Sequence, residues 1–102
     1  MAARPPSCAL QLGPHQIRVN AIGPGYVDTD LFVGLARAEV GDDEAAQQSW
    51  RQQREAKVPL GRFVTAVEVA ETTLFLCSDA ASAFTGSILH PDGGSNAAFG
   101  GG

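Results

Sequence analysis

The chain has 102 residues, which suffices for one small domain, and its apolar share of 44% excludes a compositionally disordered protein. Its net charge is −4 and its seven Lys and Arg residues form no cluster, which excludes a nucleic-acid binder that needs a basic face. Because no apolar run approaches the roughly 18 residues that span a bilayer, we expect no membrane association and a cytoplasmic location.

The first expected elements are a helix end and a strand. Residues 1–7 contain a double proline and read as irregular, whereas residues 8–12 fit the last turns of a helix that Gly13-Pro14 ends. Residues 17–22 then alternate in character and are rich in β-branched side chains, which favours a strand. The tripeptide Gly23-Pro24-Gly25 stops that strand.

Two helices are expected next. Thr29 or Asp30 can cap a short helix over residues 31–38, and glycine at 41 breaks it. A second helix over residues 44–57 is polar, with Trp50 as its one large apolar side chain. We expect these two helices to form a partly exposed flap.

A third helix and a final strand complete the pattern. Thr65 and Glu68 have the spacing of a capping box. The helix after it carries a stripe that we expect to face the core, formed by Val67, Ala70, Leu74 and Cys77 and broadened by Phe75 and Leu76. Residues 87–90 predict a short strand, and Asp92 is expected to fix the final turn through its own backbone amides. The glycine-rich tail from Ser95 on is expected to be disordered.

The order of strand, two flap helices, helix and strand predicts an α/β fold, because parallel strands are joined through a right-handed helical crossover. Five short motifs then carry a resemblance to the short-chain dehydrogenase/reductase family, in its C-terminal portion only. They lie at Arg18-Val19-Asn20 with Pro24 to Thr29, Pro59 to Arg62, Glu68 to Ala70, Ser78 to Ser82 with Thr85-Gly86, and Asp92 to Gly94.

The resemblance implies part of a Rossmann-type, doubly wound parallel sheet over residues 12–95. Residues 1–11 are then an irregular segment with the remnant of a helix, and residues 96–102 a glycine-rich tail. It also implies an NAD(P)-dependent oxidoreductase that acts on an alcohol or a carbonyl. The choice between NAD and NADP, and the substrate, are not readable from these residues.

The resemblance places the cofactor-binding residues at Pro24, Gly25, Val27 and Thr29. Ligands bind at the carboxyl ends of strands in open parallel sheets, and a glycine there lets the backbone approach a flat nicotinamide ring. In the family, the backbone matching Val27 hydrogen-bonds the carboxamide, and the hydroxyl matching Thr29 contacts the amide or phosphate region. The alternative is that Pro24-Gly25 is only a tight turn and Thr29 only a helix cap.

We assign no catalytic residue and no metal ligand. The family uses a Tyr-x-x-x-Lys pair and a Ser, but Tyr26 and Lys57, the chain's single Tyr and Lys, lack that spacing. The chain also contains no glycine-rich phosphate loop. We therefore expect it to begin just after the catalytic pair and to be inactive and a poor cofactor binder alone. A truncated product, an alternative start, a spliced form and a mis-predicted gene all remain open.

Other roles follow from the same motifs. As an alternative to the enzyme interpretation, the chain is an interaction module that docks on a full-length family subunit through its last helix and strand, at about residues 65–92. It would also form homo-oligomers, or be a product without function. His15 and His90 are expected to be surface or satisfied residues, and Cys8 and Cys77 to be reduced, partly buried thiols.

Overall fold

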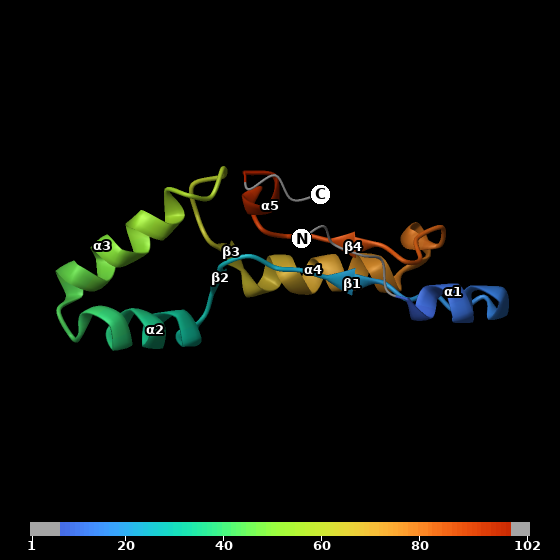
Figure 1. Cartoon of the computed structure of the whole chain (residues 1–102), viewed down its shortest axis with the longest axis horizontal. Helices are drawn as coiled ribbons and strands as arrows, with labels where there is room; N and C mark the ends of the chain where they lie inside the picture. Colours follow the sequence, from blue (N-terminus) through green and yellow to red (C-terminus); the bar gives the residue numbers. More distant parts are fainter. Residues whose placement is uncertain (1–6, 99–102) are drawn as a thin grey trace.

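The computed structural model describes residues 7–98, and residues 1–6 and 99–102 lie outside the described range. The chain is elongated, with extents of 55 × 26 × 22 Å (Figure 1). Its radius of gyration is 16.7 Å, whereas a compact domain of this length has about 13 Å. The elongation reflects two parts: a sheet body formed by β1, α4 and β4, and a flap formed by α2 and α3.

The chain combines helices with parallel strand pairs, and the expected α/β class is confirmed. In chain order they are α1 (Cys8–Leu12), a 3-10 turn (Gly13–His15), β1 (Ala21–Ile22), β2 (Val27–Asp28), α2 (Asp30–Val40), α3 (Glu44–Glu55), β3 (Val64–Thr65), α4 (Ala66–Cys77), a second 3-10 turn (Asp79–Ala81), β4 (Ile88–Leu89) and α5 (Ser95–Ala98). No helix among residues 7–98 is both long and apolar enough to cross a bilayer.

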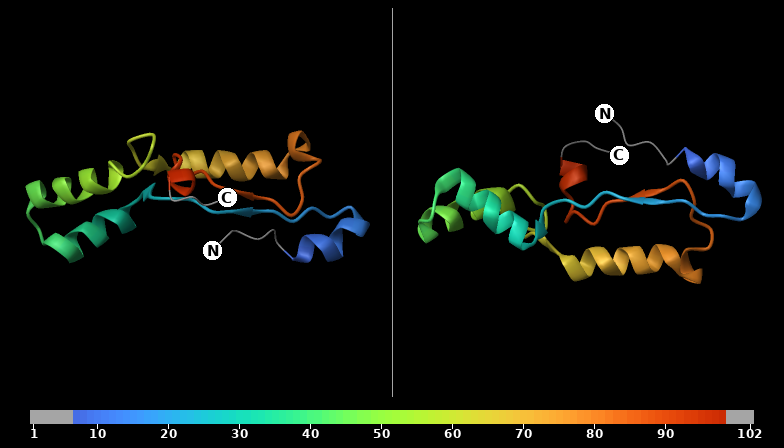
Figure 2. Two further views of the ribbon diagram at one scale, coloured as in Figure 1. Left: turned by 45° about the horizontal axis from the view of Figure 1, so that its top comes forward. Right: turned by 90° about the horizontal axis from the view of Figure 1, so that it is seen from below.

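Two parallel strand pairs organise the chain. In the sheet body β1 pairs with β4, and Ala21 lies opposite Ile88. At the base of the flap β2 pairs with β3, and Val27 lies opposite Val64, a pair that the sequence pattern did not predict. Helix α4 connects β3 to β4 and covers one face of the β1–β4 pair, as the views of Figure 2 show.

Strand β1 is shorter than the strand predicted over residues 17–22. Before Ala21, side chains connect this segment to the residues that precede β4. The Asn20 amide nitrogen donates to the carbonyl of Phe84 at 3.0 Å, and its oxygen accepts from the Ser87 amide at 3.1 Å. The Val19 amide donates to the Thr85 hydroxyl at 3.1 Å. Asn20 is therefore a residue that satisfies backbone groups at the entry of the sheet.

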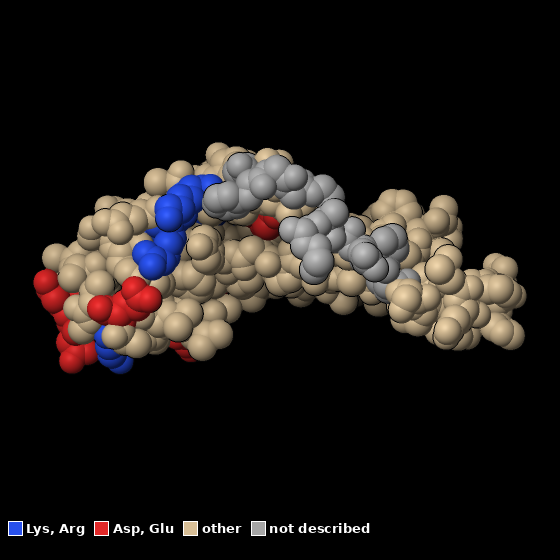
Figure 3. All heavy atoms as spheres, in the orientation of Figure 1, with Lys and Arg blue, Asp and Glu red and all other residues tan. Residues whose placement is uncertain are grey.

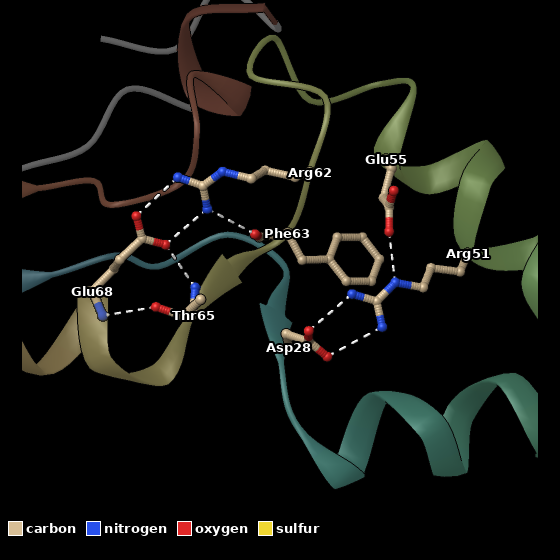
Figure 4. Close-up of polar contacts among 7 residues, drawn as sticks. All are labelled: Asp28, Arg51, Glu55, Arg62, Phe63, Thr65 and Glu68. Atoms are coloured by element: carbon tan, nitrogen blue, oxygen red, sulfur yellow. Dashed lines mark hydrogen bonds and ion pairs between the residues drawn. The ribbon is translucent and has the colours of Figure 1, made fainter.

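An aromatic cluster and an ion pair hold the flap. The rings of Phe32 and Phe63 lie 4.6 Å apart, and Tyr26 and Trp50 pack against this pair. Both Trp50 and Phe63 are buried. The Arg51 guanidinium contacts both carboxylate oxygens of Asp28, at 3.1 and 3.0 Å (Figure 4). Helix α3 ends at Glu55, two residues before the predicted end.

The expected core stripe of α4 is exposed, which corrects the prediction from sequence. Val67 and Leu74 are 64% and 69% exposed, whereas Leu76, expected to broaden the stripe, is buried. The helix rests on only two strands, so its contact face is narrow and the stripe from Val67 to Cys77 points away from it. Cys77 and Cys8 are accordingly exposed free thiols rather than partly buried ones.

The start of α4 is fixed as the sequence predicts. The Thr65 hydroxyl accepts from the Glu68 amide, and the Glu68 carboxylate accepts from the Thr65 amide, which completes the capping box. Arg62 forms a two-pronged ion pair with the same carboxylate at 2.8 and 2.9 Å (Figure 4). Arg62 therefore forms a surface ion pair at the start of α4.

The hydrogen bonds and ion pair of Glu68 make the stability of α4 depend on pH. Its hydrogen bonds, chiefly from Arg62, lower the pKa of Glu68 from 4.5 to about 2. The stabilisation is therefore complete above pH 4.5 and is lost as the pH falls from there towards 2. We expect Glu68→Gln to lower the urea midpoint at pH 7, with a difference from the parent chain that shrinks towards pH 2.

Circular dichroism during urea titration at both pH values measures this difference. Glu71→Gln is the matched control, because Glu71 lies on the same helix and has no ion pair among the described residues. An equal loss for Glu68→Gln at pH 7 and pH 2 would contradict the assignment.

Candidate functional site

The turn at the carboxyl end of β1 lies directly against the backbone near the C-terminus. A Cβ atom added at Gly25 would lie 2.8 Å from the Cβ of Asp92 and 3.1 Å from its Cα. Real Cβ atoms do not approach so closely, and the backbone of Asp92 cannot rotate away. Glycine at 25 is therefore required by this contact.

Asp92 is buried, with 7% of its surface exposed, and its carboxylate organises the turn that follows. One oxygen accepts from the Gly94 amide at 2.8 Å, and the other accepts from the Asn96 amide at 2.9 Å. This confirms the role predicted for Asp92, which caps the start of α5. The expected disorder of the tail is wrong for Ser95–Ala98, which form that helix, and residues 99–102 lie outside the described range.

The loop between α3 and β3 packs against the turn at Gly93 and Gly94. The Leu60 amide donates to the Gly93 carbonyl at 3.0 Å. Gly93 and Gly94 have φ angles of 66° and 98°, and added Cβ atoms would meet Val58 at 2.7 Å and Pro59 at 2.9 Å. Three segments distant in sequence, at residues 24–25, 58–60 and 92–94, thus meet in one joint, which we call the glycine joint.

A cavity of about 320 Å³ opens beside the glycine joint. It is lined by Pro24, Gly25, Tyr26, Lys57 and Ser95. Sequence analysis placed Pro24 and Gly25 here but set Tyr26 and Lys57 aside because their spacing was wrong. The loop that packs on Gly93 brings Lys57 to the turn, and no local sequence pattern indicates this contact. Lys57 supplies a cationic group at the rim.

The other two predicted site residues, Val27 in β2 and Thr29 at the start of α2, come after the cavity residues in sequence and do not line the cavity. The Val64 amide donates to the Tyr26 carbonyl at 3.0 Å, so in the alternation of a parallel ladder the N–H and C=O of Val27 point away from β3. Thr29 occupies the cap position of α2, but its hydroxyl makes no capping bond. The alternative of Thr29 as a helix cap is therefore wrong for its side chain.

The arrangement is suited to binding a flat, amide-bearing group. Val27 presents a backbone donor and acceptor that β3 does not use, and Thr29 presents a hydroxyl that makes no capping bond. The ring of Tyr26 packs against Phe32 and Phe63, at 5.2 and 5.4 Å, so its position is explained by the base of the flap. The ring of His90 contacts the Gly23 carbonyl at 3.2 Å, which makes it a satisfied residue as predicted.

Comparisons with known proteins agree with this geometry. The family described as enoyl-(acyl carrier protein) reductase matches residues 6–96. The chain is 40% identical over 88 residues to a 3-oxoacyl-[acyl-carrier-protein] reductase of Aquifex aeolicus, a match that covers 86% of this chain and 31% of the relative. The chain thus spans about a third of the length of the curated relatives that it matches.

Solved structures give the same result. A short-chain dehydrogenase family protein of Francisella tularensis superposes with a TM-score of 0.79 at 39% identity, over 89% of this chain and 38% of that one. L-sorbose reductase of Gluconobacter frateurii, solved with NADPH and L-sorbose, superposes with a TM-score of 0.77 at 30% identity, over 85% of this chain and 34% of that one.

The contact between Gly25 and Asp92 predicts unequal effects of the same substitution at two glycines. Gly25→Ala forces backbone apart and should cost about 1–3 kcal/mol of unfolding free energy. Gly34→Ala is the matched control, because Gly34 lies inside α2 with no atom within 4 Å of an added Cβ. It should stabilise the chain by about 0.5–1 kcal/mol. Urea unfolding of both variants measures the difference, and equal effects would contradict the packing.

Proposed function

Since the chain belongs to the short-chain dehydrogenase/reductase family, we propose that it forms the nicotinamide-side wall of an NAD(P)-dependent oxidoreductase that acts on an alcohol or a carbonyl. The observation that carries the proposal is the glycine joint, which presents the Pro24-Gly25 turn at the carboxyl end of β1 beside an open cavity. Ligands of open parallel sheets bind at that end of the strands.

The polar groups near the joint support the cofactor assignment residue by residue. The free backbone of Val27 is a donor and acceptor pair for the carboxamide. The Thr29 hydroxyl, which the helix does not use, is available to the amide or phosphate region. Lys57 would add positive charge beside the turn. The bound cofactor would supply hydride transfer, and these residues would hold and orient its nicotinamide end.

The flap would form the substrate side of the same cavity. Tyr26 of the flap's aromatic cluster lines that cavity, and Arg51, which lies over the Phe63 ring, is paired with Asp28. A surface of this kind favours a small or medium-sized substrate without high charge. The residues that would choose between NAD and NADP are not in this chain.

We propose further that the chain alone neither catalyses turnover nor binds the whole dinucleotide tightly. Neither a Tyr-x-x-x-Lys pair nor a glycine-rich phosphate loop occurs in the 102 residues. Positioned proton transfer commonly contributes a factor of about 10² to 10⁴ in rate, and the pyrophosphate is normally held at a helix N-terminus. The binding groups that this chain contains would contact only the nicotinamide end of the cofactor.

Titration with nicotinamide mononucleotide tests this function. We expect weak binding, with a Kd of about 1 mM or more, that shifts the NMR signals of the amides of Gly25 and Val27. Thr29→Val should weaken it, whereas Thr73→Val on α4 should not. Adenosine monophosphate should leave the turn unchanged.

The absence of any shift at these amides would refute the nicotinamide role. Turnover by the pure chain, or micromolar affinity for NAD or NADP, would refute the proposed lack of solo activity.

A second function is favoured by the exposed stripe of α4. We propose as the alternative that the chain docks on full-length family subunits through α4 and β4. The apolar side chains of Val67 and Leu74 project into solvent on this helix. Ala70 between them is exposed as well, and contiguous exposed apolar surface marks interaction sites.

Native mass spectrometry of the chain mixed with a full-length relative tests the alternative. We expect a mixed complex that is lost when Val67 and Leu74 are both replaced by Lys. Leu10→Lys serves as the control, because Leu10 is even more exposed but lies on α1. Retention of the complex by the double variant would exclude this surface.

A further inference from the structure

The two helices of the flap enclose a cavity of their own, of about 240 Å³, which we call the flap cavity. Its lining residues all lie within the continuous segment 32–63, on α2, on α3 and at Phe63 before β3. It shares none of them with the cavity beside the glycine joint. The flap cavity is therefore a separate site that the flap alone forms.

Aromatic rings form the floor of the flap cavity. Trp50 and Phe63 are buried, and the centroid of the Phe32 ring lies 5.4 Å from that of Trp50 and 4.6 Å from that of Phe63. The methyl group of Ala36, which is also buried, completes this apolar surface. Aromatic rings attract one another at such distances, and a cavity of about 150 Å³ already holds benzene. The flap cavity is thus large enough for one aromatic ring with a short side chain.

Polar side chains lie on the solvent side of the flap cavity. Glu44 and Gln48 are both exposed, and neither side chain forms a hydrogen bond or an ion pair among residues 7–98. The neighbouring Gln47 is already engaged, because its amide nitrogen donates to the carbonyl of Gly41 at 2.6 Å. Glu44 and Gln48 therefore have oxygen acceptors available to the polar end of a ligand.

The charge at this end of the flap favours a cation. Residues 37–44 contain four carboxylates and one guanidinium, which gives this stretch a net charge of −3. Figure 3 shows acidic atoms gathered at the end of the flap where α2 and α3 are joined. Arg51, which lies on the lining, is paired with Asp28 at 3.0 Å and with Glu55 at 2.6 Å, so it does little to repel a positive ligand.

We infer that the flap cavity binds a small aromatic amine, with its ring on the aromatic floor and its ammonium group at Glu44. An ammonium group only donates hydrogen bonds, which suits the carboxylate of Glu44 and the amide oxygen of Gln48. An aromatic carboxylate of the same size would instead be repelled by the acidic end of the flap. This inference goes beyond the proposed function, since it uses neither the Pro24-Gly25 turn nor a bound cofactor.

Such a ligand would contact both helices of the flap at once. The lining includes Val33 and Ala36 on α2 and Gln48 and Trp50 on α3, so the site exists only while the two helices face each other. A ligand that binds the closed form and not the open one stabilises the closed form by mass action. The bound amine would therefore protect the flap against opening.

The fluorescence of Trp50, the single tryptophan of the chain, reports binding at this cavity. At neutral pH we expect saturable binding of phenethylamine, with a Kd of about 1 mM or below. The neutral phenethyl alcohol should bind about threefold more weakly, and the anion phenylacetate about tenfold more weakly. No saturable change with phenethylamine, or equal binding of phenylacetate, would overturn the inference.

Two variants probe the ring and the charge separately. Ala36→Leu fills the floor and should lower the affinity at least tenfold, whereas Ala38→Leu, exposed on the same helix and outside the lining, should not. Retained binding by a folded Ala36→Leu chain would exclude this cavity. Glu44→Gln should bring phenethylamine and phenethyl alcohol to equal affinity, with Glu71→Gln as its matched control. Because Glu44 is exposed, this variant tests the site even where Ala36→Leu impairs folding, and an unchanged preference for the amine would refute the role of the carboxylate.

Nicotinamide mononucleotide separates this site from the proposed cofactor turn. It should not displace phenethylamine, because the two cavities share no lining residue. Competition between the two ligands would assign the amine to the cavity beside the glycine joint and overturn the inference. A chain that binds the amine but not the mononucleotide would support the flap cavity and refute the nicotinamide role.

Discussion

The close approach of the Gly25 backbone to Asp92 is the contact on which the candidate site depends. Because no side chain separates them, the turn after β1 rests on the turn after β4, and the carboxylate of Asp92 makes that second turn rigid by accepting two amides. The same turn supports the loop before β3 through Gly93. One buried carboxylate thereby sets the relative positions of the sheet body, the cavity and the base of the flap.

Hydrogen bonds between residues close in sequence were predictable, and contacts between distant segments were not. The capping box at Thr65 and the role of Asp92 follow from side chains that reach nearby amides, and both are confirmed. The β2–β3 pair involves only two residues on each strand, so it leaves no periodic signal. The position of Lys57 in the cavity depends on packing at Gly93, and the spacing of residues along the chain contains no trace of it.

The exposed stripe of α4 shows the limit of periodicity as an argument. The spacing of Val67 and Leu74 correctly indicates an apolar face, but it cannot tell which face the chain itself covers. Here Leu76 faces the two strands and is buried, and the stripe faces outwards. A helix above a narrow sheet thus has apolar residues on more of its circumference than its two strands cover.

The flap's contacts are almost entirely its own. Its aromatic cluster and the Arg51–Asp28 pair lie within residues 26–63, and the glycine joint is its main connection to the rest. We expect such a segment to open as a unit while the β1–β4 ladder stays closed. A substitution in that cluster would therefore speed proteolysis of the flap without changing the protection of the ladder, a separation that native-state exchange measures.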